Sequence, residues 1–238
     1  MVKNHLKRIR APRNWRLKRK ERKWIARPMP GAHPLNECLT LDTIVKDILH
    51  LGKTSREVNF ILNNNELVID TKIRKDKKFS VGLMDIIEIP KLRQKFRVCY
   101  NKKGELNLVG IDDKESSLKL LKIKTKVKIK NGKIQLGFHD GKSIILDKCD
   151  SKVGDSVLFD LNKKSIIKFL PLEEGSIVLI TKGKNTGMIG TVKQITLGNK
   201  LSKALCTFDV DGSKLSTAKD YVFVVGKEKQ ETTVGANK

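Results

Sequence analysis

A strict alternation of apolar and basic residues constrains the fold of this chain more than any other feature. Residues 122–130 read KIKTKVKIK, with Ile123, Val127 and Ile129 on one face and lysines on the other. A period of two indicates a β-strand with one buried face. The Asn131-Gly132 pair that follows is typical of a type I′ hairpin turn, and HDGKS at 139–143 indicates another turn. After residue 96, short strands and turns recur closely, which predicts small β-barrels rather than β-α-β units.

The segment before residue 96 has a different pattern. Apolar residues on one face of 44–49 predict a helix, and Gly52 stands where a C-terminal cap would lie. The sequence TSRE at 54–57 predicts a capping box that opens a second helix, with Val58, Ile61 and Leu62 buried. Short strands are expected at 67–70 and 85–89. Together these elements predict a compact α+β module of two short helices on a small sheet.

The charge of the chain points to a polyanionic partner. Lys and Arg number 50 against 26 Asp and Glu, which gives a formal net charge of +24. Nucleic acid is the first expectation and an anionic membrane surface the second. The sequence lacks a membrane-spanning apolar run and a signal-peptide pattern, so a soluble intracellular protein is expected. The four cysteines and four histidines are scattered along the chain, so no metal site and no disulfide framework are expected. No cofactor is expected either.

Residues 1–30 carry twelve Lys or Arg and one acid, Glu21. Their apolar residues are too sparse for an independent core, so an extension that orders on a partner is expected. Basic residues interleaved with tryptophan suit RNA, whose phosphates bind Arg and Lys and whose bases stack on aromatic rings. A disordered solubilising arm is the alternative. The RNA-binding candidates here are Lys7, Arg8, Arg10, Arg13, Trp15, Arg16, Arg19, Lys20, Arg22, Lys23, Trp24 and Arg27.

Further candidates lie in the α+β module and on the alternating strand. The start of the second helix could direct its positive end at a phosphate, beside a basic loop at 74–78. The alternatives are a solvated loop and, for the strand, lysines that guard an edge against aggregation. The candidates are Lys53, Arg56, Arg74, Lys75, Lys77, Lys78, Lys126 and Lys128.

The stretch KGKNTGMIGTVKQI at 182–195 has three glycines, Gly183, Gly187 and Gly190, ahead of an apolar strand. Such density predicts positive φ or a close approach of another group to the backbone. An RNA backbone lying against the turn would bind Lys182, Lys184, Asn185 and Gly187. A bulged hairpin with solvated lysines is the alternative. The stretch is not a P-loop, because the G-x-x-x-x-G-K-[ST] pattern is absent and a strand follows.

The same stretch resembles the KOW motif of ribosomal proteins and transcription elongation factors. Residues 41–90, with ELVIDTKIRKDKKFSVGLMDIIEI, resemble an S-four-type RNA-binding domain. The order of HLKR, AP before a tryptophan, GLMDIIEI, the KOW turn and VFVVGK resembles the small-subunit ribosomal protein S-four-e family, in an archaeal-like form. The resemblance implies a basic extension at 1–40, an S-four-type α+β domain at 41–104, a β-barrel-like central domain at 105–172, an SH3-like KOW barrel at 173–226 and a polar tail at 227–238.

The family implies a structural constituent of the small ribosomal subunit that binds small-subunit rRNA, neighbours other small-subunit proteins and supports translation in the cytoplasm. No small-molecule substrate or membrane is expected. The sequence shows no catalytic carboxylate pair and no nucleophile with a nearby histidine, so no enzyme is predicted. The alternatives are a KOW-containing transcription or RNA-processing factor and an S-four-domain enzyme that modifies RNA.

Overall fold

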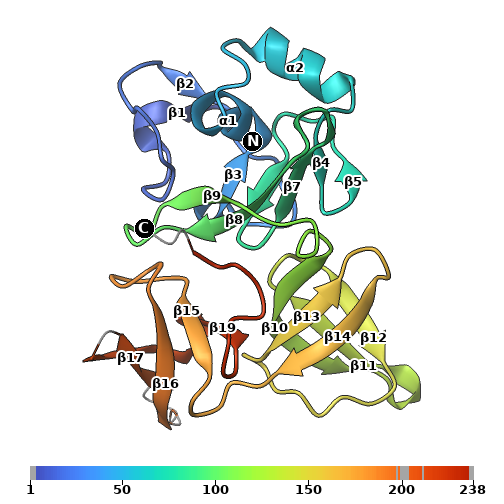
Figure 1. The fold of residues 1–238 in the computed structure, drawn as a ribbon, viewed down its shortest axis with the longest axis vertical. Helices are drawn as coiled ribbons and strands as arrows, with labels where there is room; N and C mark the ends of the chain where they lie inside the picture. Colours follow the sequence, from blue (N-terminus) through green and yellow to red (C-terminus); the bar gives the residue numbers. More distant parts are fainter. Residues whose placement is uncertain (1–3, 197, 199–203, 211, 236–238) are drawn as a thin grey trace. The chain divides into compact units, whose positions relative to one another are not determined.

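The computed structural model describes residues 4–196, 198, 204–210 and 212–235. The chain divides into two compact units (Figure 1). The first comprises Met1–Cys99 with Glu105–Ser116, and the second comprises Tyr100–Gly104 with Ser117–Lys238. The five-part division predicted from the sequence stays a prediction.

The first unit contains the helices predicted from the sequence, on small antiparallel sheets. Its α-helices are α1 (Leu41–Thr43), which continues as a π-helix (Ile44–Ile48), and α2 (Ser55–Asn63). The strands pair as β1-β2, as β3-β6 and as a five-stranded sheet in the order β5-β4-β7-β8-β9. Their bounds are β1 Leu6–Lys7, β2 Trp24–Ile25, β3 Cys38–Thr40, β4 Val68–Ile69, β5 Lys72–Ile73, β6 Ser80–Gly82, β7 Ile86–Ile89, β8 Gln94–Tyr100 and β9 Leu106–Gly110.

The capping box at the start of α2 is confirmed. The Glu57 N–H donates to Thr54 Oγ1 (3.3 Å), and the Thr54 N–H donates back to the Glu57 carboxylate (3.5 Å). Val58 and Leu62 are buried as predicted, whereas Ile61 is half-buried. The cap predicted at Gly52 is wrong, since the left-handed residue after the π-helix is His50, with φ 55°.

The second unit holds two five-stranded antiparallel sheets. Their strand orders are β12-β11-β10-β13-β14 and β18-β17-β16-β15-β19. The strands of the first are β10 Leu118–Lys128, β11 Ile134–Phe138, β12 Ser143–Leu146, β13 Ser156–Asp160 and β14 Ser165–Leu170. Those of the second are β15 Ile177–Ile180, β16 Ile189–Thr196, β17 Leu205–Val210, β18 Ser213–Ala218 and β19 Val222–Gly226. The chain is thus mostly β with few helices, as the sequence predicts.

Strand β10 confirms the alternating pattern only in part. Its first half pairs with β13 and its second half with β11, so β10 is the central strand that joins β11 to β13. A register shift between Ile123 and Thr125 marks a β-bulge, which changes the face that later residues present. Val127, predicted to be buried, is therefore 57% exposed. The hairpin that follows is confirmed, with positive φ at Asn131 (67°) and Gly132 (73°).

None of the helices among the described residues is both long enough and apolar enough to span a membrane.

Candidate nucleic-acid interface

The basic N-terminal segment is folded onto the first unit, which differs from the expected extension. Its two strands pair with Leu6 opposite Ile25 and Lys7 opposite Trp24. Trp15 lies in the core at 2% exposure and forms a parallel bridge with Leu106. The few apolar residues of the arm thus join the core of a neighbouring module, which the sparse apolar pattern could not reveal.

The two tryptophans have opposite environments. The prediction that Trp15 stacks on a base is wrong for this conformation, because no face of its buried ring is open. Trp24 is 51% exposed, with the His5 ring centroid 5.6 Å away and Lys23 Nζ 5.5 Å from its own ring centroid. A ring that is half open and flanked by a cation fits a nucleobase, which carries a π-face.

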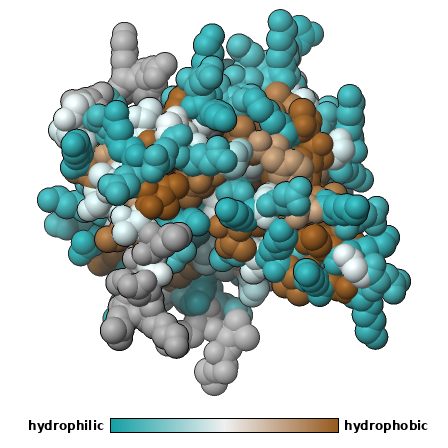
Figure 2. Space-filling view, turned by 90° about the horizontal axis from the view of Figure 1, so that it is seen from below, coloured by the Kyte–Doolittle hydropathy of each residue, from teal (hydrophilic) through white to brown (hydrophobic). Residues whose placement is uncertain are grey.

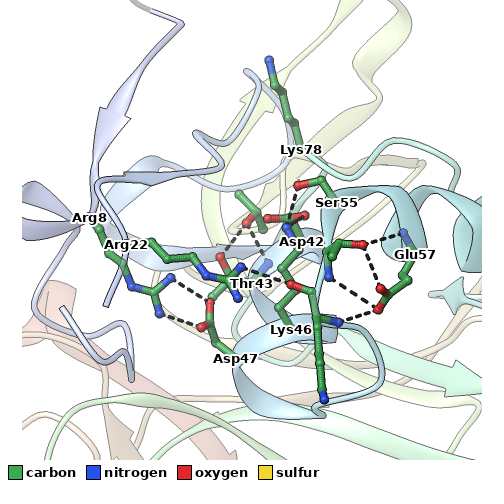
Figure 3. A network of polar contacts seen from close by, with 12 residues as sticks. Arg8, Arg22, Asp42, Thr43, Lys46, Asp47, Ser55, Glu57 and Lys78 are labelled. Carbon is green, nitrogen blue, oxygen red and sulfur yellow. Dashed lines mark hydrogen bonds and ion pairs between the residues drawn. The ribbon is translucent and has the colours of Figure 1, made fainter. Parts of the chain in front are cut away.

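Arg8 is anchored inside the protein instead of facing a partner (Figure 3). Its guanidinium donates to both carboxylate oxygens of Asp47, at 2.6 and 3.4 Å, and its Nε donates to the Lys18 carbonyl at 2.8 Å. The side chain is only 4% exposed. The bidentate pair fixes the arm to the π-helix, so Arg8 is a structural residue and its predicted phosphate contact is corrected.

Arg19 also serves the arm itself, since its guanidinium donates to the carbonyls of Ile9, Ala11 and Pro12. Arg22 donates through one nitrogen to the Lys53 carbonyl at 3.1 Å. The remaining arm candidates are exposed or half-buried on the surface. These are Lys7, Arg10, Arg13, Arg16, Lys20, Lys23 and Arg27.

The start of α2 already has a negative partner from the chain. The Glu57 carboxylate accepts from the Lys53 N–H at 2.7 Å and from the Thr54 N–H and hydroxyl. These bonds, that from the Lys53 backbone first, lower the pKa of Glu57. A phosphate at this helix end would meet that carboxylate, so the predicted use of the helix dipole is not supported. Arg56 itself is exposed.

The basic loop at 74–78 is fixed to its surroundings rather than freely solvated. The Lys77 and Lys78 carbonyls accept from the N–H groups of Asp42 and Met29, at 2.9 and 3.0 Å. The guanidinium of Arg74 lies 4.5 Å from the centroid of the Phe79 ring. Lys75 is exposed, while Lys77 and Lys78 are half-buried.

The glycine-rich turn of the second unit is shaped by the chain's own backbone. Gly183 and Gly187 have φ of 94° and 89°. A Cβ on Gly187 would lie 2.0 Å from the Asn101 carbonyl oxygen, and one on Gly190 would lie 2.5 Å from the Asp209 carbonyl oxygen. The close approach predicted from the glycines is therefore real, but protein fills it. The interpretation of Gly187 as an RNA contact is corrected for this reason.

Lysines around this turn and on β10 differ in what they contact. Lys182 and Lys184 are exposed and Asn185 is half-buried. Lys126 Nζ donates to the Cys149 and Ser151 carbonyls at 2.8 and 2.9 Å, whereas Lys128 is exposed. Lys126 thus uses two of its three N–H donors within the protein.

Lys119 and Lys122, in the first half of β10, have internal roles that their charge does not predict. Lys119 is fully buried and pairs with Asp140 at 3.2 Å. Lys122 Nζ donates to the Asp220 and Val222 carbonyls, each at 2.7 Å. Burial, with the charges of Lys182 and Lys219 adding to it, lowers the pKa of Lys122 to about 8.

Cys38 and Cys99 are buried in the core. Burial raises the pKa of Cys38 and of Cys99 to about 12, so both thiols are protonated at neutral pH. Within the described part of the chain, no three His, Cys, Asp or Glu side chains are grouped so that they could hold a metal ion.

Figure 2 shows hydrophilic side chains over much of one face of the protein, with hydrophobic patches between them. Even if each of the 26 acids paired with a cation, 24 of the 50 Lys and Arg would lack an acidic partner. This excess is what a polyanion would neutralise.

Comparison with known proteins identifies the family. Sequence models match residues 92–166 for "Ribosomal family S4e" and residues 2–36 for the RS4NT domain. The small ribosomal subunit protein eS4 of Methanocaldococcus jannaschii is 38% identical over 234 residues, covering 95% of each chain. That of Korarchaeum cryptofilum is 39% identical over 227 residues, covering 94% of each. The crystal structure of the 30S ribosomal protein S4e from Thermoplasma acidophilum has a TM-score of 0.71 at 36% identity, covering 80% of this chain and 96% of that one.

The two relatives match nearly the whole chain, and together with the family model they place it among ribosomal proteins rather than enzymes. Specifically, the chain belongs to the S4e family of small-subunit ribosomal proteins. The resemblance inferred from the sequence is thereby confirmed.

Proposed function

We propose that this chain is a structural constituent of the small ribosomal subunit, that it binds and stabilises small-subunit rRNA, and that it supports translation in this way. The observation that carries the proposal is the likeness, over 94% or more of the chain, to proteins named small ribosomal subunit protein eS4. The proposed location is the cytoplasmic ribosome. The proposed partners are the rRNA and neighbouring small-subunit proteins.

The mechanism is electrostatic and geometric. Exposed lysines and arginines displace counterions from rRNA phosphates, and small rigid sheets hold the RNA in one shape. Trp24 adds a surface on which a base can stack. The exposed predicted residues are the proposed phosphate contacts: Lys7, Arg10, Arg13, Arg16, Lys20, Arg22, Lys23, Lys53, Arg56, Lys75, Lys128, Lys182 and Lys184.

Sedimentation of the tagged full-length chain in its host cells tests the proposal. We expect the protein to move with small subunits and with whole ribosomes on sucrose gradients, and to remain there through a moderate-salt wash. A chain that sediments with RNA polymerase would instead be a KOW-containing transcription factor. A chain that stays at the top of the gradient would contradict the structural role.

A further inference from the structure

A pocket in the first unit lies between the basic arm and the helical segment. Its volume is about 720 Å³. Its walls come from arm residues between 16 and 22, from residues between 46 and 53, and from Glu105. The pocket exists because the arm is folded: the Arg8–Asp47 ion pair and the Arg22–Lys53 hydrogen bond fasten the arm alongside the π-helix.

The charges of the wall do not balance internally. Asp47 lines the pocket, but Arg8 holds both of its carboxylate oxygens. Lys46 is likewise engaged, by Asp42 at 2.6 Å and by the Ser55 hydroxyl at 2.7 Å (Figure 3).

The wall residues outside these pairs leave an excess of positive charge. They are the cations Arg16, Lys18, Arg22 and Lys53 and the acids Glu21 and Glu105. Four cations against two acids give a site that favours an anion.

The wall also offers apolar surface and the imidazole of His50. Leu17 and Ile48 contribute the apolar surface. His50 stands in a left-handed conformation, and its Nδ1 lies 3.0 Å from the Lys46 carbonyl oxygen. Because a carbonyl only accepts, Nδ1 donates in this bond, which leaves Nε2 as the ring nitrogen available to a ligand.

We propose that this pocket binds one unpaired nucleotide of RNA, an inference that rests on the RNA-binding function proposed above. The phosphate would contact Arg22 and Lys53, and the base or sugar would lie against Leu17 and Ile48 and form a hydrogen bond with His50. A bare phosphate would leave the apolar wall and the His50 ring unused. A base-paired nucleotide would not present its free edge, which single-stranded RNA does.

Histidine side-chain NMR spectra of the full-length protein provide the test. The chain has four histidines, His5, His33, His50 and His139, so each imidazole can be assigned. Adenosine and cytidine 5′-monophosphate are the probes, with inorganic phosphate and a short oligo-glutamate peptide as comparisons. We expect the His50 signal to shift saturably with either nucleotide, and at higher concentration or to a smaller extent with phosphate and with the peptide.

A double variant, Arg22→Gln with Lys53→Gln, should weaken nucleotide binding roughly ten-fold, since two charge-assisted contacts are lost. Lys114→Gln with Lys163→Gln removes the same charge from exposed positions outside the pocket wall and should leave the affinity unchanged. A far-ultraviolet circular dichroism spectrum that matches wild type shows that each variant is folded.

Three outcomes would overturn the pocket assignment: an unmoved His50 signal, equal weakening by both double variants, or stronger binding of the peptide than of the nucleotides. Equal shifts with phosphate and nucleotide would reduce the site to an anion site and also contradict the proposal. If the chain sediments with small subunits but fails this test, only the pocket proposal is contradicted. If it does not sediment with them, the proposed function itself is contradicted.

Discussion

Gly187 lies against the backbone of Asn101, where a Cβ would come within 2.0 Å of the carbonyl oxygen. The glycines of the turn at 183–190 predict positive φ or close approach, and the structure confirms both features. The approaching group, however, is the Asn101 carbonyl, 86 residues earlier in the sequence. A residue pattern states that space is needed, but long-range packing decides what occupies it.

We therefore predict that Gly187→Ala destabilises the protein by about 2 kcal/mol or more, because strained φ adds to a clash with the Asn101 carbonyl. Gly175→Ala is the matched control, since its φ of 86° is nearly the same but nothing lies within 4 Å of its Cβ position. Urea titration followed by circular dichroism measures both. Equal losses in the two variants would show that the contact with Asn101 has no energetic weight.

The lowered pKa of Lys122 should make the free energy of unfolding depend on pH. Its pKa is near 8 in the folded protein and near the ordinary value of 10.5 when unfolded. Between these values the unfolded state binds more protons, so the free energy of unfolding rises with pH across this window. Both carbonyl bonds survive deprotonation, because a neutral amine still has two N–H donors.

The comparison is between wild type and Lys122→Met, with the free energy of unfolding measured from pH 7 to beyond pH 10.5. Other groups titrate in both proteins, so only the difference is informative. We expect wild type to gain stability relative to the variant between about pH 8 and pH 10.5. A difference that stays flat would contradict the lowered pKa.

At the scale of elements, caps and turns could be predicted from neighbouring residues, whereas the pairing and burial of the strands could not. The capping box at Thr54–Glu57 and the turn at Asn131-Gly132 follow from a few adjacent residues, and both are present. The alternation at 122–130 predicts a strand, but a bulge after Ile123 exposes Val127. The bulge has no sequence mark, because it depends on which strands pair with each half of β10.

The arm is a second element whose packing the sequence did not reveal. Its apolar residues are too sparse to form a core of their own, but they pack into the core of the first unit. Among the candidate RNA-binding residues of the arm, the exposure of the lysines could be predicted from their charge alone. The burial of Arg8 and Trp15 was not, because their partners Asp47 and Leu106 are distant in sequence.

The anchoring of the arm gives a prediction at this scale. Asp47→Asn leaves the buried Arg8 guanidinium without its carboxylate, with only Glu21 at 3.8 Å. We expect a loss of about 2 kcal/mol, because a buried charge is left poorly compensated. Tryptophan emission during urea titration should shift to the red at a lower denaturant concentration than in wild type, as buried Trp15 becomes exposed.

Asp147→Asn is the control, since it breaks the exposed Lys133–Asp147 pair, whose side chains are 53% and 87% exposed. That loss should stay below about 1 kcal/mol. If the two substitutions cost the same, the arm is not held by the Arg8–Asp47 pair.

At the scale of the whole molecule, net charge and motif order carried the functional inference. The excess of 24 cations is distributed over both units, from the arm to the glycine-rich turn. Composition indicated a polyanion, and the order of motifs indicated the family, which comparison with relatives confirmed. The internal roles of Lys119, Lys122 and Lys126 show that the count of basic residues overstates the number available to RNA.

Ultraviolet cross-linking of the full-length chain to RNA in its host cells, followed by sequencing of the bound RNA, tests the proposed function most directly. We predict that cross-links gather at a few positions of the small-subunit rRNA and that peptides from the arm, Trp24 included, carry them. Cross-links spread over nascent transcripts or messenger RNA would favour a transcription or RNA-processing factor, and an absence of small-subunit rRNA among the bound sequences would contradict the account.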